Sequence, residues 1–132
     1  MGLYVLLVED NPDHALLAKR SLERDDRIER VEVCEDAFAA LAVMRDEQVR
    51  RPDAVVVDIR LPGISGLELL DSIKGDPRTA GVPVIVVSTS APEHEVRSAI
   101  RRGARAYMSK PIRAGELIAN LRRPDRVPRE LT

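Results

Sequence analysis

The sequence lacks the features that indicate a membrane, a disulfide scaffold or a nucleic-acid partner. No apolar run approaches the ~20 residues that cross a bilayer, and the run at 5–8 ends at two acids. The single cysteine, Cys34, cannot form an internal disulfide and lies in an apolar-alternating stretch typical of a core strand. The 21 basic and 22 acidic side chains nearly cancel, so no overall field attracts nucleic acid or an anionic membrane. We therefore expect a cytoplasmic protein with no signal peptide and no membrane anchor.

The length and composition fit one compact domain. The chain has 132 residues, of which 44% are hydrophobic, and this leaves little room for a second folded unit. Residues 1–123 are expected to form that domain, and the proline- and charge-rich residues 124–132 are expected to form a flexible C-terminal tail.

Short β-branched runs alternate with segments whose apolar residues recur at helical spacing. The pattern predicts strands at 3–8, 28–34, 54–57, 84–87 and 106–108, and helices at 14–24, 37–47, 66–74, 93–102 and 115–122. The runs at 5–8, 55–57 and 84–87 are continuously apolar, which is typical of parallel strands covered by helices on both faces. The sequence therefore predicts an α/β fold, a three-layer αβα sandwich.

Several residues mark helix ends or faces. The capping-box pattern S/T-x-x-E begins at Ser65 and again at Ser90, which predicts a helix start at each. Gly75 and Gly103 follow the last turns of the third and fourth predicted helices, where a left-handed residue is favoured. Phe38 belongs to an apolar helical stripe and is expected in the core.

Polar residues stand at the predicted carboxyl ends of four strands, where an open parallel sheet forms its ligand site. They are Glu9 and Asp10 after the first strand, Asp58 after the third, Ser88, Thr89 and Ser90 after the fourth, and Lys110 and Pro111 after the fifth. Three converging carboxylates repel one another and would either raise a carboxyl pKa or recruit a cation, and a divalent metal with oxygen ligands, such as Mg2+, resolves the conflict. A carboxylate beside Mg2+ can attack a phosphoryl group, so Asp58, Lys110 and Ser88 supply the parts of an acyl-phosphate site.

Five motifs together resemble a known family. They are Val8-Glu9-Asp10-Asn11, the run 57–63 followed by Gly66, the run 83–88, Gly103-Ala104, and Tyr107-Met108-Ser109-Lys110-Pro111. With these motifs, residues 3–122 resemble the receiver domain of bacterial response regulators. The resemblance implies a flavodoxin-like (βα)5 fold with a five-stranded parallel sheet in the order 2-1-3-4-5. A narrower resemblance, carried by the runs 73–77, 82–84 and 88–90, is to the small regulators that partner bacterial phytochrome kinases.

The resemblance implies a role for each residue of the site. Asp58 would accept a phosphoryl group from a histidine kinase or a phosphotransfer protein in a reaction that depends on Mg2+, for which Mn2+ could substitute. The implied metal ligands are Glu9, Asp10, Asp58 and the backbone carbonyl of Arg60. The implied phosphate-binding residues are Ser88, Thr89 and Lys110, the switch residues are Ser88 and Tyr107, and the Lys110-Pro111 peptide bond is expected to be cis.

The resemblance also implies two contact surfaces. The first predicted helix and its adjoining loops would receive the kinase, with His14, Leu17, Ile64 and Ile112 as candidate contacts. The face built from the fourth helix, fifth strand and fifth helix would bind an unknown downstream protein, or a second copy of the chain in a homodimer. Neither surface implies direct contact with nucleic acid or with a membrane.

Other functions compete with this one. A receiver unit of a longer regulator, with a DNA-binding or enzymatic output domain, would have the same features. The sequence argues against two enzymatic or carrier functions on the same fold. An aspartyl phosphatase requires a second acid at the position of Arg60, and a flavin-binding electron carrier requires a Ser/Thr/Gly-rich loop after the first strand. A receiver that signals without phosphorylation is disfavoured by the intact pocket residues. We expect no enzymatic activity beyond the chain's own phosphorylation and dephosphorylation.

Overall fold

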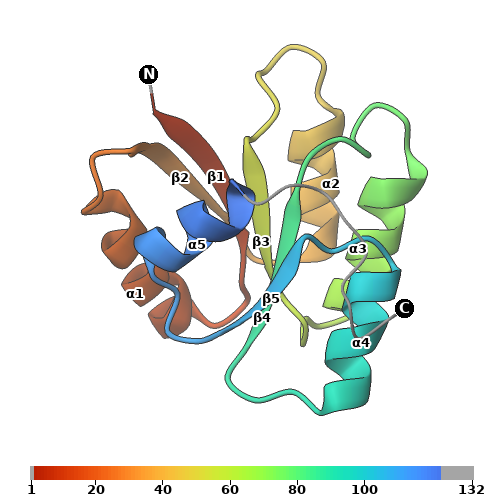
Figure 1. Ribbon diagram of the computed structural model, residues 1–132. Coiled ribbons are helices and arrows are strands. Elements are labelled where there is room, and N and C mark those ends of the chain that lie inside the picture. The colour runs from red at the N-terminus through yellow and green to blue at the C-terminus, as the bar shows by residue number, and fades with distance from the viewer. Residues whose placement is uncertain (1, 123–132) are drawn as a thin grey trace.

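The computed structural model describes residues 2–122, so the tail predicted at 124–132 lies outside the described residues. Strands and helices alternate along the chain (Figure 1). The strands are β1 (Leu3–Val8), β2 (Ile28–Cys34), β3 (Ala54–Asp58), β4 (Val84–Ser88) and β5 (Ala106–Ser109). The helices are α1 (Pro12–Glu23), α2 (Ala37–Arg45), α3 (Gly66–Gly75), α4 (Glu93–Arg101) and α5 (Ala114–Leu121). The strands form one parallel sheet in the order β2-β1-β3-β4-β5, which confirms the predicted topology.

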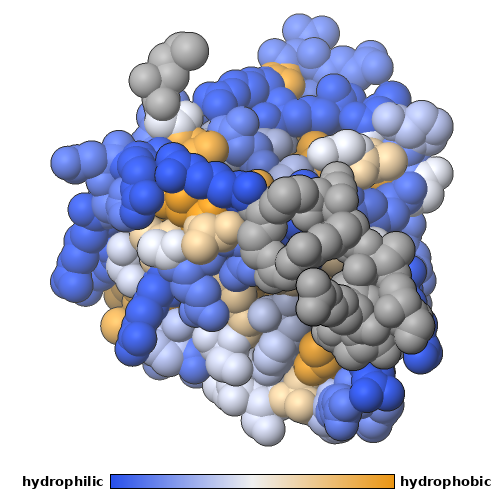
Figure 2. Space-filling model, in the orientation of Figure 1, coloured by the Kyte–Doolittle hydropathy of each residue, from blue (hydrophilic) through white to orange (hydrophobic). Residues whose placement is uncertain are grey.

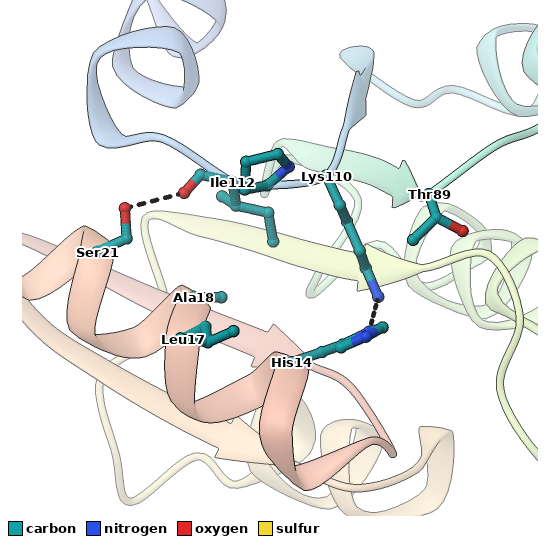
Figure 3. Close-up of a pocket in the computed structure, with 8 residues that line it drawn as sticks. His14, Leu17, Ala18, Ser21, Thr89, Lys110 and Ile112 are labelled. Carbon is teal, nitrogen blue, oxygen red and sulfur yellow. Dashed lines mark hydrogen bonds between the residues drawn. The ribbon is translucent and has the colours of Figure 1, made fainter.

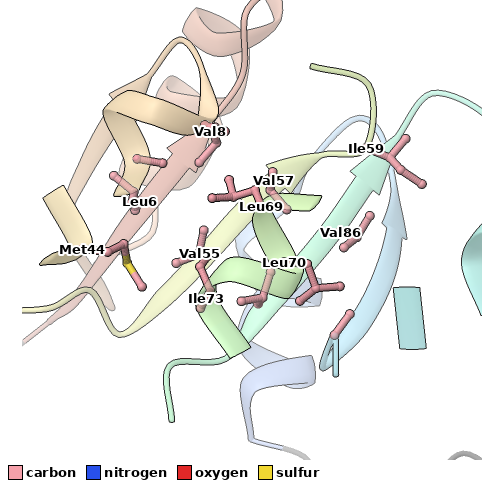
Figure 4. Packing of buried hydrophobic residues seen from close by; sticks show 14 of the residues in the cluster. Leu6, Val8, Met44, Val55, Val57, Ile59, Leu69, Leu70, Ile73 and Val86 are labelled. Atoms are coloured by element: carbon pink, nitrogen blue, oxygen red, sulfur yellow. The ribbon is translucent and has the colours of Figure 1, made fainter. Parts of the chain in front are cut away.

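Helices cover both faces of the sheet and complete the three-layer sandwich. In Figure 1, α1 and α5 lie on one face, and α2, α3 and α4 lie on the other. Alternate side chains of a strand point to opposite faces, so β1 contributes to two cores. Val5 and Leu7 pack in the cluster that contains residues of α1 and α5. Leu6 and Val8 pack in the cluster with α2 and α3, shown in Figure 4.

Helix α1 begins earlier than the sequence predicts. It starts at Pro12 because the side chain of Asn11 caps it: Asn11 Oδ1 accepts hydrogen bonds from the backbone N–H groups of Asp13 and His14, at 2.9 and 3.1 Å. Proline is favoured in the first turn of a helix because a backbone N–H there has no intrahelical acceptor, so its absence loses no hydrogen bond. The cap places His14 at the end of the helix that faces the carboxyl edge of the sheet (Figure 3).

Two predicted helix-end signals are confirmed and two are wrong. The capping box at Ser65 is present, and Gly103 has a positive φ of 107°. Ser90 does not cap α4, because the N-cap is Pro92 and no side-chain hydrogen bond caps the helix. Gly75 is the last residue of α3 and has no positive φ, so the helix ends without a left-handed residue there.

The prediction that Phe38 lies in the core is wrong, because its side chain is 65% exposed. Helix α2 is apolar around most of its circumference, and Ala37, Ala40 and Met44 occupy the side that faces the sheet. Phe38 follows Ala37 by one residue and therefore points about 100° away from it around the helix. Periodicity does not identify the buried face of a helix that is apolar nearly all round.

Polar side chains cover most of the molecular face shown in Figure 2, where the hydrophobic patches are small and separate. This surface agrees with the 33% of charged residues in the sequence. Within residues 2–122, no helix combines the length and the apolar character needed to cross a membrane.

Candidate functional site

Four strand ends bring the predicted site residues together at one edge of the sheet. A hollow of about 200 Å3 opens there. It is lined by Glu9, Asp10, Asn11, His14, Asp58, Arg60, Ser88, Thr89 and Lys110. All residues predicted to bind metal or phosphate therefore surround one space. Asn11 and His14 also line it, although the sequence did not assign them to the pocket.

Asp58 is the last residue of β3 and is 8% exposed. Its Oδ1 accepts a hydrogen bond from the backbone N–H of Arg60 at 2.8 Å, and its Oδ2 accepts one from Nζ of Lys110 at 2.6 Å. Gly66 begins α3 directly behind it, where a Cβ would lie 2.3 Å from the Asp58 carbonyl oxygen. Glycine at this position therefore lets the start of α3 pack against the strand end that carries the carboxylate.

Lys110 connects the two buried acids. Its side chain is 11% exposed, and its Nζ donates to Oε1 of Glu9 as well as to Asp58. Nδ1 of His14 lies 3.1 Å from the same Nζ (Figure 3). Burial lowers the pKa of Lys110, but hydrogen bonds and charges from Asp58 and Glu9 outweigh burial and raise it above its ordinary value. The Lys110-Pro111 peptide bond that follows is cis, as predicted.

The acidic residues supply oxygen donors of the kind that Mg2+ prefers. Glu9 is 3% exposed and its Oε2 accepts the backbone N–H of Asn11 at 3.1 Å, whereas Asp10 is exposed at the rim. Among the residues that the structure describes, no three His, Cys, Asp or Glu side chains are grouped so that they could hold a metal ion. The donor set fits a hard cation in its chemistry, while the Lys110 ammonium supplies the positive charge between Glu9 and Asp58.

The predicted switch residues lie on neighbouring strands, Ser88 at the end of β4 and Tyr107 within β5. Ser88 is buried, and its Oγ donates to the carbonyl oxygen of Ser90 at 2.9 Å and accepts the Ser90 N–H at 3.1 Å. The hydroxyl is therefore engaged within its own loop. Thr89 lines the hollow beside it. Tyr107 is half-buried and packs against the core cluster of the face that α2, α3 and α4 cover.

A second hollow of about 300 Å3 lies between α1 and the segment that follows β5 (Figure 3). Its lining is His14, Leu17, Ala18, Ser21, Thr89, Lys110, Pro111 and Ile112. Leu17 is exposed, as a partner contact requires. Ile112, another candidate contact, is 3% exposed and lines the hollow from its buried side. Ile64 is half-buried, does not line this hollow, and packs against the other core cluster.

The side chain of Arg60 makes a contact that the sequence did not indicate. Its Nη2 donates to Oε1 of Glu95 at 3.1 Å and so joins the loop after β3 to the first turn of α4. The partners are 35 positions apart, and no motif links them. Only the folded chain brings these two residues together.

The parallel sheet in this strand order, with buried Asp58 paired to Lys110 at its carboxyl edge, is the arrangement that the motifs predicted for a receiver domain. The sequence model for the response regulator receiver domain matches residues 5–122. The chain therefore belongs to the response regulator receiver family, as its motifs predict.

Individual relatives agree with this assignment. The chain is 37% identical over 111 residues to the probable methanogenesis regulatory protein FilR2 of Methanothrix harundinacea, a match that covers 82% of this chain and 72% of FilR2. The phosphorylated cyanobacterial phytochrome response regulator RcpA has 29% identity and a TM-score of 0.78, covering 92% of this chain and 89% of RcpA. The Mn2+-bound response regulator Rcp1 has 27% identity and a TM-score of 0.75, covering 90% and 88% of the two chains. Phytochrome response regulators are thus among its structural neighbours, as the narrower resemblance predicts.

Proposed function

We propose that this chain is a phosphorylatable receiver of a two-component phosphorelay, which accepts a phosphoryl group on Asp58 from a histidine kinase or a phosphotransfer protein. One observation carries the proposal: Nζ of Lys110 binds Oδ2 of Asp58 at 2.6 Å, in a hollow that Glu9 also lines. This arrangement gives a carboxylate nucleophile a fixed cation beside the oxygen that reacts. The phosphorylated state of the similar protein RcpA supports the proposal.

The proposed reaction transfers a phosphoryl group from the imidazole of a phosphohistidine. An oxygen of the Asp58 carboxylate attacks phosphorus in line with the P–N bond, so that an O–P bond forms and the P–N bond breaks. The imidazole leaves with the electron pair of the broken bond and takes up a proton. The Lys110 ammonium turns from the carboxylate to a phosphoryl oxygen and stabilises the charge that spreads over the transferring group.

The proposal includes a divalent cation, Mg2+ or in its place Mn2+. Glu9, Asp10, Asp58 and the backbone carbonyl of Arg60 would hold the cation, which would neutralise charge on the carboxylates and the phosphoryl group. The oxygen donors that line the hollow support this role. So does the similarity to Rcp1, whose structure is of a Mn2+-bound form.

The proposed output is a change in the face built from α4, β5 and α5. The Ser88 hydroxyl would leave Ser90 and bind the phosphoryl group beside Thr89, and Tyr107 would move into the space behind it. The two hydrogen bonds of Ser88 within its own loop support this, because they can be exchanged for one charge-assisted hydrogen bond. The altered face would bind a downstream protein or a second copy of the chain.

The hollow beside α1 suggests where the phosphodonor docks. Its floor is apolar, with Ala18 and Ile112, and exposed Leu17 stands at its rim next to the His14 that also lines the phosphorylation pocket. A helix that presents a phosphohistidine could place an apolar side chain here while its imidazole faces Asp58. Since RcpA is a phytochrome response regulator, a phytochrome-type histidine kinase is the first donor to test.

The proposal is tested by incubating the purified protein with acetyl phosphate and Mg2+ and measuring its intact mass. We expect the mass of one added phosphoryl group, and no such increment when a chelator removes the cation. An increment that is equal with and without the chelator would overturn the metal requirement. No increment under any condition would overturn phosphorylation itself.

A further inference from the structure

One ion pair connects the phosphorylation pocket to helix α4. Arg60 follows Asp58 by two residues, lines the pocket and donates its backbone N–H to Oδ1 of that aspartate at 2.8 Å. Its guanidinium reaches in the other direction, to Oε1 of Glu95 at 3.1 Å. One residue therefore touches the reacting carboxylate with its backbone and the first turn of α4 with its side chain.

Helix α4 is anchored weakly by apolar packing. Ala99 is its one buried residue, and no side chain caps its N-terminus. By comparison, α3 buries several residues and has a complete capping box. In Figure 1, α4 lies beside α3, and at the far end of α4 Nη1 of Arg102 donates to Oδ2 of Asp71 at 3.2 Å. Ion pairs therefore attach both ends of α4 to neighbouring segments, in addition to the packing of Ala99 and Ile100 against the core.

We infer that Glu95 is a positioning residue: it holds the guanidinium of Arg60 against α4 until Asp58 carries a phosphoryl group, which then takes the guanidinium and releases the first turn of α4. The inference rests on the proposed phosphorylation of Asp58. It adds a link to α4 that does not pass through Ser88 or Tyr107.

The phosphoryl group competes with Glu95 for the guanidinium of Arg60, and two properties favour the phosphoryl group. A phosphoryl group carries about −1.5 to −2 charges near neutral pH and offers three acceptor oxygens, and a guanidinium binds such a group with two parallel hydrogen bonds. Glu95 carries one charge and contacts Arg60 through a single hydrogen bond at 3.1 Å, with the guanidinium largely exposed to water. A partly exposed ion pair of this kind is weak and easily exchanged.

Release does not require α4 to unfold. Glu93 and Glu95 both lie in its first turn, where the partial positive charge of the helix N-terminus stabilises carboxylates. Glu95 therefore keeps a favourable environment after the guanidinium leaves. The expected change is a looser attachment of the N-terminal turn, with the helix itself retained.

Glu93 provides a matched control for Glu95. It lies in the same turn and forms an ion pair at 2.6 Å, but its partner is Arg97 of the same helix, so that pair joins α4 to nothing else. Glu93→Gln and Glu95→Gln remove the same charge from the same turn. They differ in whether the pair connects α4 to the pocket.

The test measures hydrogen–deuterium exchange of the peptide that contains α4, before and after acetyl phosphate and Mg2+, with the phosphorylated fraction read from intact mass. In the native sequence and in Glu93→Gln, phosphorylation should speed exchange of the first turn by roughly two- to fivefold. This is the change in exchange rate expected when the stabilisation by one partly exposed ion pair is lost. Glu95→Gln and Arg60→Met should exchange faster from the outset, and phosphorylation should then add little.

Two results would overturn the inference alone. One is full phosphorylation of the native sequence with unchanged exchange of α4, and the other is an equal acceleration in the native sequence and in Glu95→Gln. If Glu95 only stabilised α4, the second result would also follow, because Glu95→Gln would speed exchange of α4 equally before and after phosphorylation. If the native protein gains no phosphoryl mass, the proposed function fails, and the inference fails with it.

Discussion

Replacing Lys110 with methionine keeps an unbranched side chain but removes the ammonium that Glu9 and Asp58 share. These two residues are 3% and 8% exposed, so the variant leaves two carboxylates close together with little water and no cation. Removing one partner of a buried ion pair costs about 3–5 kcal/mol. Water can enter the hollow of about 200 Å3 at the site and partly solvate the carboxylates, so we expect a loss near the lower limit of this range. We therefore expect Lys110→Met to lower the free energy of unfolding by about 3 kcal/mol.

Urea unfolding followed by circular dichroism measures this loss. Lys19→Met is the matched control: Lys19 is half-buried on α1, and its replacement should change the free energy of unfolding by no more than about 0.5 kcal/mol. Adding Asp58→Asn to Lys110→Met removes one of the two unpaired charges and should restore about 1 kcal/mol. A loss below about 1 kcal/mol in Lys110→Met would refute the reasoning. So would a double variant whose loss of unfolding free energy equals the sum of the losses of Lys110→Met and Asp58→Asn.

The pH dependence of this effect has a defined sign. The folded state raises the pKa of Lys110, so the stabilisation is fully present below the ordinary lysine pKa of about 10.4 and is lost as the pH rises through the folded value. The stability difference between the native sequence and Lys110→Met should therefore be largest below that pH and shrink above it. A difference that grows as the solution becomes more alkaline would contradict the pairing.

Three further predictions follow from local contacts. Gly66→Ala should lower the free energy of unfolding by about 1–3 kcal/mol, because its Cβ would meet the carbonyl oxygen of Asp58, whereas Gly75→Ala, with open space around it, should not destabilise. Equal losses in urea unfolding would argue against close packing at 66. Burial raises the pKa of Cys34 to about 11, so a thiol reagent near neutral pH should modify it far more slowly than free cysteine, and a rate equal to that of free cysteine would be inconsistent with its burial. Ser65→Ala removes the capping box and should cost about 1 kcal/mol, and a thermal melt that does not shift would show that the cap contributes no stability.

The topology and most of the pocket could be predicted from the sequence because both depend on short-range patterns. The continuously apolar runs of β1, β3 and β4 indicate strands that are buried on both faces. Such strands end where polar residues begin. Glu9, Asp58 and Ser88 stand at such ends, Lys110 follows the shorter strand β5, and parallel strands place their carboxyl ends at one edge. Proximity of these residues follows from the fold class alone.

The features that the sequence did not reveal depend on side-chain geometry between distant segments. Nδ1 of His14 lies 3.1 Å from Nζ of Lys110, although the two residues are 96 positions apart in the sequence. The pair of Arg60 and Glu95 joins two segments that no local pattern relates.

Local patterns can also mislead when two structures share one signal. The S-x-x-E pattern at Ser90 fits a capping box, yet the backbone N–H of Ser90 donates to the hydroxyl of Ser88 and the helix starts after Pro92. The loop contact with Ser88 takes precedence over the cap. In the same way, the apolar stripe that contains Phe38 is real, but another side of α2 faces the sheet.

The central claim is that Asp58 accepts the phosphoryl group, and the most direct measurement compares intact masses of three proteins after incubation with acetyl phosphate and Mg2+. The proteins are the native sequence, Asp58→Asn, and Asp26→Asn, in which an exposed aspartate is replaced as a control. We expect the native sequence and Asp26→Asn to gain one phosphoryl group each and Asp58→Asn to gain none. A phosphoryl increment in Asp58→Asn, or its absence from all three proteins, would contradict the assignment.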